Sequence, residues 1–327
     1  MATTRVAISS INSAPAGAAA IHGTPIPGMS LTATHTIIDA DGMGAVSLQW
    51  QSRASEGSSW ISLSIGPTLS LTDALSGQQI RTVASYLDNR GTLESISSAI
   101  VVTVASFSAS ATGGSDLLRG TAASDALNSA GGNDVLFGMG GNDMLNGAVG
   151  LDTALYSGKR SDYIVLRSAD SWSVVSVADG LDTLVDIERL IFADRHVAID
   201  IDGVGGQAYR LYQAAFARTP DGGGLGFWMK SMDGGVTLRD VAAGFIQSDE
   251  YKAAYGTNQT NAQLVEKFYF NILGRAPERA GSDFWINVLN TKADTVEGVL
   301  AAISESAENK GNVAVVIGNG FEYIPYG

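Results

Sequence analysis

The chain of 327 residues contains no cysteine and only three histidines. Without cysteine, a disulfide framework, thiol catalysis and cysteine-ligated zinc are excluded. The histidines, His22, His35 and His196, lie in separate segments, so none is expected to act as a catalytic base or a zinc ligand. The HExxH, GxSxG, P-loop and CxxC motifs are also missing. We therefore expect a protein that is not an enzyme.

Basic residues are also few, because 20 lysines and arginines stand against 33 acidic residues and give a formal net charge of −13. This acidic balance argues against binding to nucleic acid or to an anionic membrane surface, and it suits carboxylates that bind a cation. No apolar run approaches the roughly eighteen residues that a transmembrane helix needs, so membrane insertion is not expected. The first residues lack the basic and apolar regions of a Sec signal peptide.

What the chain does contain is a strict nine-residue spacing of aspartates between Ala111 and Leu155. A small residue lies two positions before each aspartate, and a leucine lies two positions after each of the first four. The aspartates are Asp116, Asp125, Asp134, Asp143 and Asp152, the small residues are Gly114, Ala123, Gly132, Gly141 and Gly150, and the leucines are Leu118, Leu127, Leu136 and Leu145. Glycine permits tight loops, and Ca²⁺ prefers hard carboxylate oxygens. The pattern predicts a calcium-binding parallel β-roll rather than a flexible Gly/Asp-rich linker.

One turn of such a roll takes two nonapeptides, so each row should lie over the row eighteen residues later. This places Asp116, Asp134 and Asp152 on one edge and Asp125 and Asp143 on the other. Two ions are expected on the first edge and one on the second. The sequence GLDTL at 180–184 echoes GLDTA at 150–154, so Asp182 is a further candidate ligand although its offset is not a multiple of nine.

The rows GGNDVL and GGNDML resemble the RTX (hemolysin-type) calcium-binding repeats of proteins exported by bacterial type I secretion. Other rows depart from that pattern, since Ala122 and Ala123 replace the usual glycines and the fifth row reads GAVGLD. The resemblance implies Ca²⁺ as the cofactor, an extracellular or cell-surface location, and the type I secretion machinery as a partner. In such a protein the apolar residues 313–327 would form an uncleaved secretion signal; the alternative is a C-terminal strand or docking tail.

Residues 1–105 read as six or seven short strands, which predicts a β-sandwich. This part resembles the Ig-like or cadherin-like modules of bacterial surface proteins, with Trp50 as a candidate core residue. Asp39 and Asp41 in DADGMG predict a turn in preference to a calcium loop. Residues 106–202 contain the roll, followed by DYIVLR and WSVVSV, which predict a hairpin that caps it.

Residues 203–327 have a helical pattern, with Thr237 as a predicted N-cap, and repeat at an offset of 57. The matched positions are Tyr212 and Tyr269, Phe216 and Leu273, Arg218 and Arg275, Pro220 and Pro277, Gly224 and Gly281, Phe227 and Phe284, and Trp228 and Trp285. Each half should hold three helices. The motifs LYQAAFARTPDGGGLGFW and NILGRAPERAGSDFW resemble the DUF4214 family, which has no agreed activity.

Two features of this helical part have alternative interpretations. The Phe-Trp pairs are either core residues or a sugar-binding platform. Arg218 with Asp221, and Arg275 with Glu278, form either helix-capping ion pairs or a ligand clamp.

The sequence as a whole predicts a multidomain β plus α protein. Its parts are an Ig-like β-sandwich, a calcium-binding parallel β-roll with a β cap, and a C-terminal α-helical bundle of two repeats. The expected function is that of a secreted, non-enzymatic surface protein, structural or adhesive, in which Ca²⁺ triggers folding and self-assembly. A lectin-like module for cell-surface polysaccharide is the alternative, and an extracellular hydrolase is the weakest of the three.

Overall fold

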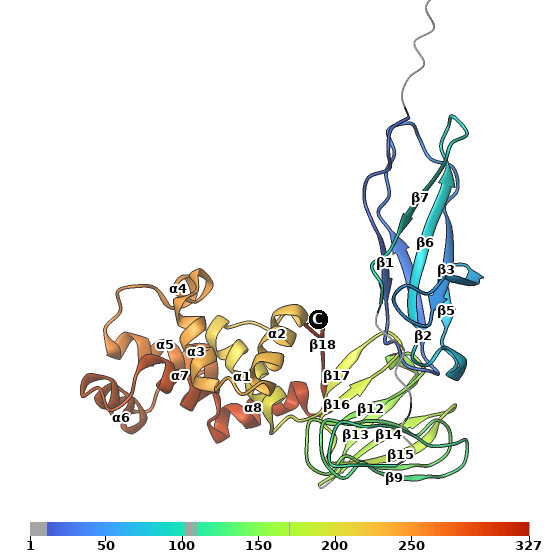
Figure 1. Cartoon of the computed structure of the whole chain (residues 1–327). Coiled ribbons are helices and arrows are strands. Elements are labelled where there is room, and N and C mark those ends of the chain that lie inside the picture. The colour runs from blue at the N-terminus through green and yellow to red at the C-terminus, as the bar shows by residue number, and fades with distance from the viewer. Residues whose placement is uncertain (1–11, 102–106, 108–109, 170, 327) are drawn as a thin grey trace, which may run out of the picture. The chain divides into compact units, whose positions relative to one another are not determined.

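The computed structural model describes residues 12–101, 107, 110–169 and 171–326 (Figure 1). The chain divides into two compact units, Met1–Phe107 and Ser108–Gly327. The described part of the first unit is built from strands and one short 3-10 helix, whereas the second holds the repeats and the α-helices. The protein is therefore mixed β and α, as its sequence predicts. The expected boundary between roll and helices falls inside the second unit, so the three-domain division stays a prediction.

The first unit consists of two antiparallel sheets, with strand orders β1-β2-β5 and β4-β3-β6-β7. Their elements are β1 (Ala19–His22), β2 (Ser30–His35), β3 (Ser47–Arg53), β4 (Ile61–Ile65), β5 (Thr68–Ser70), η1 (Asp73–Leu75), β6 (Gln79–Leu87) and β7 (Leu93–Ser97). Leu31 and Leu69 from one sheet pack with Trp50 and Ile80 from the other. The indole N–H of Trp50 donates a hydrogen bond to the carbonyl of Gly66 at 3.0 Å. This is a sandwich with a buried tryptophan, and its finer Ig-like assignment stays a prediction.

The segment with Asp39 and Asp41 is a turn. Asp39 accepts a hydrogen bond from the Asp41 amide at 2.8 Å and another from the Tyr86 hydroxyl at 2.7 Å. Asp41 pairs with Arg90 at 2.6 Å and accepts from the amide of Ser13. Because these contacts within the sandwich occupy both carboxylates, the turn interpretation is the one that the structure supports.

In the second unit, the nonapeptide rows alternate between two stacked parallel sheets. The row strands are β8 (Leu117–Arg119), β9 (Ala126–Asn128), β10 (Val135–Phe137), β11 (Met144–Asn146) and β12 (Thr153–Leu155). Val135 lies opposite Leu117 on one side and Thr153 on the other, and Met144 lies opposite Ala126. Each of these pairs is eighteen residues apart, so the predicted register is confirmed. Side chains two positions after the aspartates, such as those of Leu136 and Leu145, point inward and are fully buried.

A hairpin interrupts the roll after the fifth row. The elements that follow are η2 (Arg160–Asp162), β13 (Ile164–Arg167), β14 (Trp172–Ser176), β15 (Gly180–Val185), β16 (Arg189–Ile191) and β17 (His196–Ala198). β13 and β14 pair antiparallel, as DYIVLR and WSVVSV predict. The chain then returns to the roll, because β15 pairs in parallel with β11 and β16 in parallel with β12. One more turn of the roll is thus added beyond the nonapeptides.

Eight helices follow in the described part of the chain, as two repeats of four. They are α1 (Val204–Phe216), α2 (Gly222–Asp233), α3 (Leu238–Gln247), α4 (Asp249–Tyr255), α5 (Asn261–Leu273), α6 (Arg279–Asn290), α7 (Val296–Ser304) and α8 (Ala307–Ile317). Adding 57 to the bounds of α1 and α2 gives those of α5 and α6. The expectation of three helices in each half was wrong. Ser248 and Ser306 each accept a hydrogen bond from a following amide and so begin a fourth helix.

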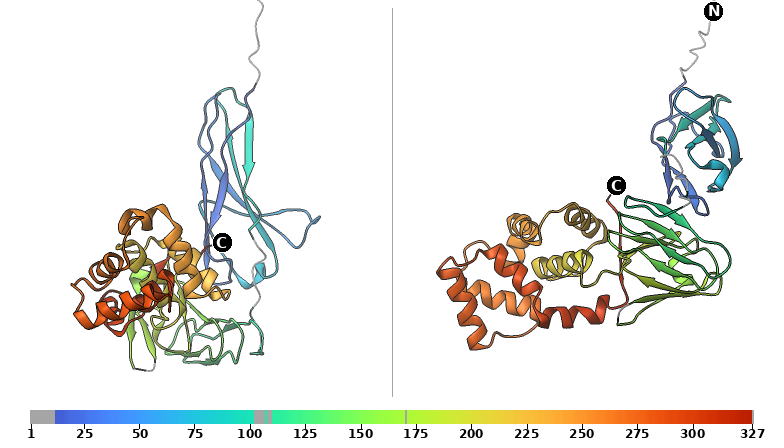
Figure 2. Two further views of the ribbon diagram at one scale, coloured as in Figure 1. Left: turned by 90° about the vertical axis from the view of Figure 1, so that its left-hand side faces the viewer. Right: turned by 60° about the horizontal axis from the view of Figure 1, so that its bottom comes forward.

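The last described residues are part of this fold. β18 (Phe321–Tyr323) pairs antiparallel with β17 and extends the six-stranded sheet of the roll. Figure 2 shows it lying between the roll and the helices. Phe321 packs against Tyr209 of α1 at a ring distance of 5.0 Å, and the Ile324 amide donates to the Gly222 carbonyl at 3.0 Å. The segment thus forms the C-terminal strand that the sequence left as an alternative.

No helix in the described part of the chain is long and apolar enough to cross a membrane.

Candidate calcium ladders

The aspartates of the rows form two vertical ladders along the edges of the roll. In the first ladder the amides of Asp116 and Asp134 donate to Oδ1 of Asp134 and Asp152, at 2.7 and 2.8 Å. In the second, the amide of Asp125 donates to Oδ1 of Asp143 at 2.8 Å. Each carboxylate therefore caps the main chain of the turn before it, which fixes the distance between successive acidic groups.

Both ladders extend beyond the nonapeptide rows. The Asp143 amide donates to Oδ1 of Asp182 at 3.0 Å, and the Asp152 amide donates to Oε2 of Glu188 at 2.7 Å. The first ladder is thus Asp116, Asp134, Asp152 and Glu188, and the second ladder is Asp125, Asp143 and Asp182. The nine-residue spacing places only Asp125 and Asp143 on the second edge, and the further candidate Asp182 joins them because the chain returns to that edge after the hairpin of β13 and β14.

The inner carboxylates each keep one oxygen without a hydrogen-bond partner. These atoms are Oδ2 of Asp134, Asp143 and Asp152, and the three residues are at most 2% exposed. A buried carboxylate oxygen without a donor is costly. A cation between the turns would remove that cost by supplying the missing positive charge.

The aspartates of the first turn differ from the inner ones. Oδ2 of Asp116 accepts hydrogen bonds from the amide and the hydroxyl of Thr112, at 2.6 and 2.8 Å. Oδ2 of Asp125 accepts the same pair from Thr121, at 2.6 and 2.9 Å. These carboxylates are already satisfied by protein donors, so they depend less on a cation than the inner ones do.

Glycines leave the space around these oxygens open. A Cβ on Gly120 would lie 2.8 Å from Oδ2 of Asp125, and one on Gly147 would lie 2.6 Å from Oδ2 of Asp152. In the loop before Asp143, a Cβ on Gly141 would lie 2.6 Å from the carbonyl oxygen of Ala123, which is eighteen residues earlier. Side chains at these positions would fill the space beside the carboxylates and separate the stacked loops. The row pattern of glycine before aspartate is therefore a packing requirement.

Burial in this acidic stack changes the ionisation of its later members. Desolvation, with the charge of the neighbouring carboxylate, raises the pKa of Asp152 to about 6 and that of Asp182 to about 7. Desolvation likewise raises the pKa of Glu188 to about 7 and that of Asp143 above its usual range. Each shift reports an anion that the protein alone stabilises poorly.

The donor set fits Ca²⁺ when main-chain oxygens are included. Among the described residues, no group of three or more acidic or histidine side chains could hold a metal ion. Each pair of turns instead offers carboxylates from two rungs, and the loop carbonyls lie beside them. Ca²⁺ accepts such mixed oxygen ligands. The residues suited to hold it are the aspartates of both ladders, with the sequence-predicted Gly114, Ala123, Gly132, Gly141 and Gly150 supplying the close loop backbone.

The GLDT echo predicted Asp182 as a ligand, whereas Glu188 was not predicted. Both residues occupy the place of a row aspartate, as the strand pairs Met144 with Thr183 and Thr153 with Arg189 show. Glu188 lies 36 residues from Asp152, which is four times the row spacing, but it is a glutamate and no small residue of the row pattern lies two positions before it.

Comparison with known families agrees with the two ladders. The family model described as RTX calcium-binding nonapeptide repeat matches residues 110–145 and 119–154. The model described as Domain of unknown function (DUF4214) matches residues 208–254 and 242–313. The chain carries RTX repeats and a DUF4214 domain. The RTX repeats bind Ca²⁺, which is accordingly the cofactor of this protein.

Comparison with whole proteins adds little to this RTX assignment. No curated protein matches the chain. Among solved structures, the extracellular lipase LipA from Serratia marcescens is similar over 27% of this chain and 16% of the lipase, with 17% identity and a TM-score of 0.26. The chain thus matches only a small part of that lipase, and the likeness supports no inference about activity.

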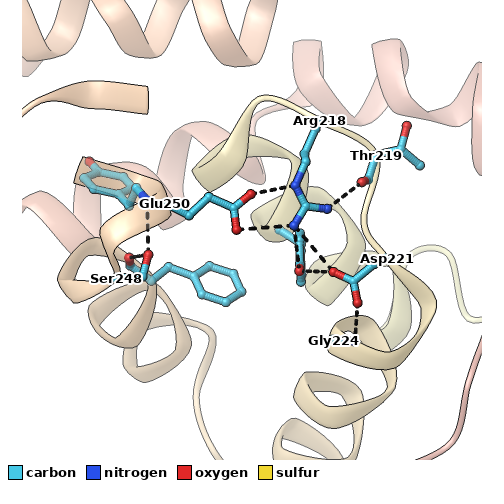
Figure 3. Close-up of polar contacts among 9 residues, drawn as sticks. Arg218, Thr219, Asp221, Gly224, Ser248 and Glu250 are labelled. Atoms are coloured by element: carbon cyan, nitrogen blue, oxygen red, sulfur yellow. Dashed lines mark hydrogen bonds and ion pairs between the residues drawn. The ribbon is translucent and has the colours of Figure 1, made fainter. Parts of the chain in front are cut away.

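The arginine clusters of the DUF4214 domain are internal ion pairs. The Arg218 guanidinium binds Glu250 of α4 at 2.6 Å, donates to the Thr219 carbonyl at 3.1 Å, and reaches the Tyr212 hydroxyl at 3.2 Å (Figure 3). Asp221 accepts from the Tyr212 hydroxyl and caps α2 through the Gly224 amide. In the second repeat, Arg275 likewise binds Glu308 of α8, the Ala276 carbonyl and Glu278, and the Tyr269 hydroxyl donates to Glu278. The Glu278 side chain makes no capping hydrogen bond to α6. The guanidinium donors of Arg218 and Arg275 are used within the fold. We therefore interpret both clusters as ion pairs between helices, and the Asp221 side chain also caps α2.

The two tryptophans of the DUF4214 domain are partly buried and pack against the helical core. Trp228 packs edge-on against Phe245 at 5.0 Å, and Trp285 is partly buried against the same core. The preceding residues are more accessible, with Phe227 37% and Phe284 57% exposed. A flat sugar platform made of the tryptophans is therefore not favoured.

Proposed function

We propose that this protein is a secreted, non-enzymatic calcium-binding surface protein in which Ca²⁺ drives folding and assembly outside the cell. The observation that carries the proposal is the pair of acidic ladders, whose inner members keep buried oxygens without a partner. Such a roll is poorly stabilised at the low Ca²⁺ concentration of a cell interior and becomes stable where Ca²⁺ is abundant. A role as a surface-layer subunit or adhesin follows from this coupling of folding to the exterior.

The sandwich offers a surface suited to assembly. β4 is an edge strand of its sheet, and on it Ile61 is 63% and Ile65 is 71% exposed. An exposed apolar edge strand is a template for pairing with another chain. This supports self-assembly over a monomeric role.

Assembly is tested with the full chain by negative-stain microscopy in millimolar Ca²⁺ and in EGTA. We expect ordered lattices or filaments only with Ca²⁺. Ile65→Lys should abolish them without changing Ca²⁺ binding, because a lysine blocks edge pairing. Val177→Lys, at an even more exposed apolar position in the turn after β14, is the control and should assemble normally. Monomers in both conditions, together with a specific glycan-array signal, would favour the lectin-like alternative.

Export by type I secretion is the second part of the proposal, and the fold determines how it can be tested. Val313, Ile317 and Phe321 are buried, so deleting residues 313–327 would remove core residues and a strand. Val315 and Val316 remain 89% and 66% exposed.

We expect that replacing Val315, Val316 and Ile324 with serine lowers the secreted fraction and leaves the purified protein folded. Val236→Ser, at an exposed position in the same unit, is the control. Secreted and cell-associated protein are compared by immunoblot. Unchanged secretion of the triple variant would count against a signal in this segment.

A further inference from the structure

The end of the first ladder carries an acidic residue that lies outside the RTX repeats. Glu188 precedes β16 as Asp152 precedes β12, and its Oε2 accepts the Asp152 amide at 2.7 Å. This is the contact that Asp152 itself makes with the Asp134 amide at 2.8 Å. Glu188 therefore stands in the position of a row aspartate.

The loop before β16 explains why a glutamate is found there. Six residues, 147–152, separate β11 from β12, whereas only three, 186–188, separate β15 from β16. The shorter loop gives the main chain less length with which to reach the ladder. The additional methylene of a glutamate side chain extends the carboxylate toward the preceding turn. An aspartate at this position would carry its carboxylate closer to its own backbone.

A second observation concerns Asp152, the neighbour of Glu188 in the first ladder, whose carboxylate has an oxygen without a hydrogen-bond donor. Asp152 is fully buried, and its Oδ2 has no hydrogen-bond donor. A Cβ on Gly147 would lie 2.6 Å from that oxygen and closer still to the carbonyl oxygen of Asp186, the first residue of the loop that ends at Glu188. A carbonyl and an unpartnered carboxylate oxygen thus border the same space beside Glu188.

We propose that Glu188 and Asp152 hold a further calcium ion, one that the nonapeptide repeats alone would not provide. This inference rests on the proposed function, since it assumes that the ladders bind Ca²⁺. It extends the first ladder from two ion positions to three. The carbonyl of Asp186 is suited to supply a main-chain ligand.

The position of this ion connects the roll to the helices. The carbonyl of Glu188 accepts a hydrogen bond from the Ile199 amide at 2.9 Å. The next residue, Arg189, pairs with Asp200 and with Asp233 of α2. An ion bound by Glu188 would fix the strand that carries this arginine. Its binding should therefore stabilise the contact between β16 and the first helices.

The test measures bound calcium per chain in the full-length protein, by elemental analysis after gel filtration, for wild type and for Glu188→Gln. Glutamine has the size of glutamate and keeps an oxygen that can accept the Asp152 amide, but it lacks the charge. We expect a loss of about one ion per chain, because the number of charged ligands determines Ca²⁺ affinity. Glu266→Gln, an exposed glutamate on α5, is the matched control and should bind as wild type does.

Hydrogen exchange gives the second measurement. In wild type, Ca²⁺ should slow exchange at β16 and at the end of α2, where Asp233 lies. In Glu188→Gln, the protection at β10 should remain while that at β16 is reduced. If Glu188→Gln does not fold, the same count is made on Glu188→Asp, which keeps the charge but shortens the side chain and should also lose about one ion. Full binding by the folded variant would overturn the proposal. Absence of calcium from wild type would instead refute the function on which the proposal rests.

Discussion

Chelation of calcium from the full chain should remove the protection of the RTX roll and leave the sandwich folded. Three buried carboxylates, those of Asp134, Asp143 and Asp152, have an unpartnered oxygen. An uncompensated buried charge costs several kcal/mol, and a site at about a hundred times its Kd contributes about 2.7 kcal/mol. The loss of several such sites is comparable with the 5–15 kcal/mol that a typical domain has in total.

Hydrogen exchange with mass spectrometry measures this effect segment by segment. Amides of β10, β11 and β12 should become unprotected in EGTA and regain protection when Ca²⁺ is restored. Those of β3 and β6 provide an internal control, because they lie in the other compact unit and have no ladder. Protection of the roll that does not respond to EGTA would show that the ladders fold without a metal ion.

Asp143→Asn should lose about two bound ions, whereas Asp125→Asn should lose about one or fewer. Asp143 lies between Asp125 and Asp182 in the second ladder, so its carboxylate borders two intervals. Asp125 borders one, and its Oδ2 is already held by Thr121. Two lost sites would remove about 5 kcal/mol of calcium-dependent stability at a hundred times Kd.

These two substitutions are closely matched, because they remove the same charge from the same phase of the repeat. Calorimetric stoichiometry and thermal unfolding in Ca²⁺ would measure both effects. The nonapeptide spacing gives Asp143 one neighbour in the second ladder, Asp125, whereas the structure gives it Asp182 as well. The result therefore distinguishes these two descriptions of the ladder. Equal losses for Asp143→Asn and Asp125→Asn would mean that Asp182 does not continue the ladder as a ligand.

The sequence by itself determined the register and the inward face of the roll. A period of nine repeats glycine, aspartate and leucine in the same phase, and a turn of two rows then sets each row over the row eighteen residues later. The offset of 57 likewise predicted corresponding helices in the two DUF4214 repeats. Local signals of this kind succeed because each repeat unit contains its own loop, strand or helix cap. The short fourth helices were missed because their serine caps precede weakly patterned sequence.

Only the tertiary structure decided where the ladders end. Asp182 and Glu188 reach them because β15 and β16 pair with strands that lie far from them in sequence, beyond the inserted hairpin of β13 and β14. Pairing between distant strands depends on how the whole sheet packs, and the offset of 39 between Asp143 and Asp182 is not a multiple of nine. The same reason places Phe321 against the helices and makes the apolar C-terminal segment a strand of the roll. Local pattern fixed the repeated unit, and long-range packing fixed the residues that complete it.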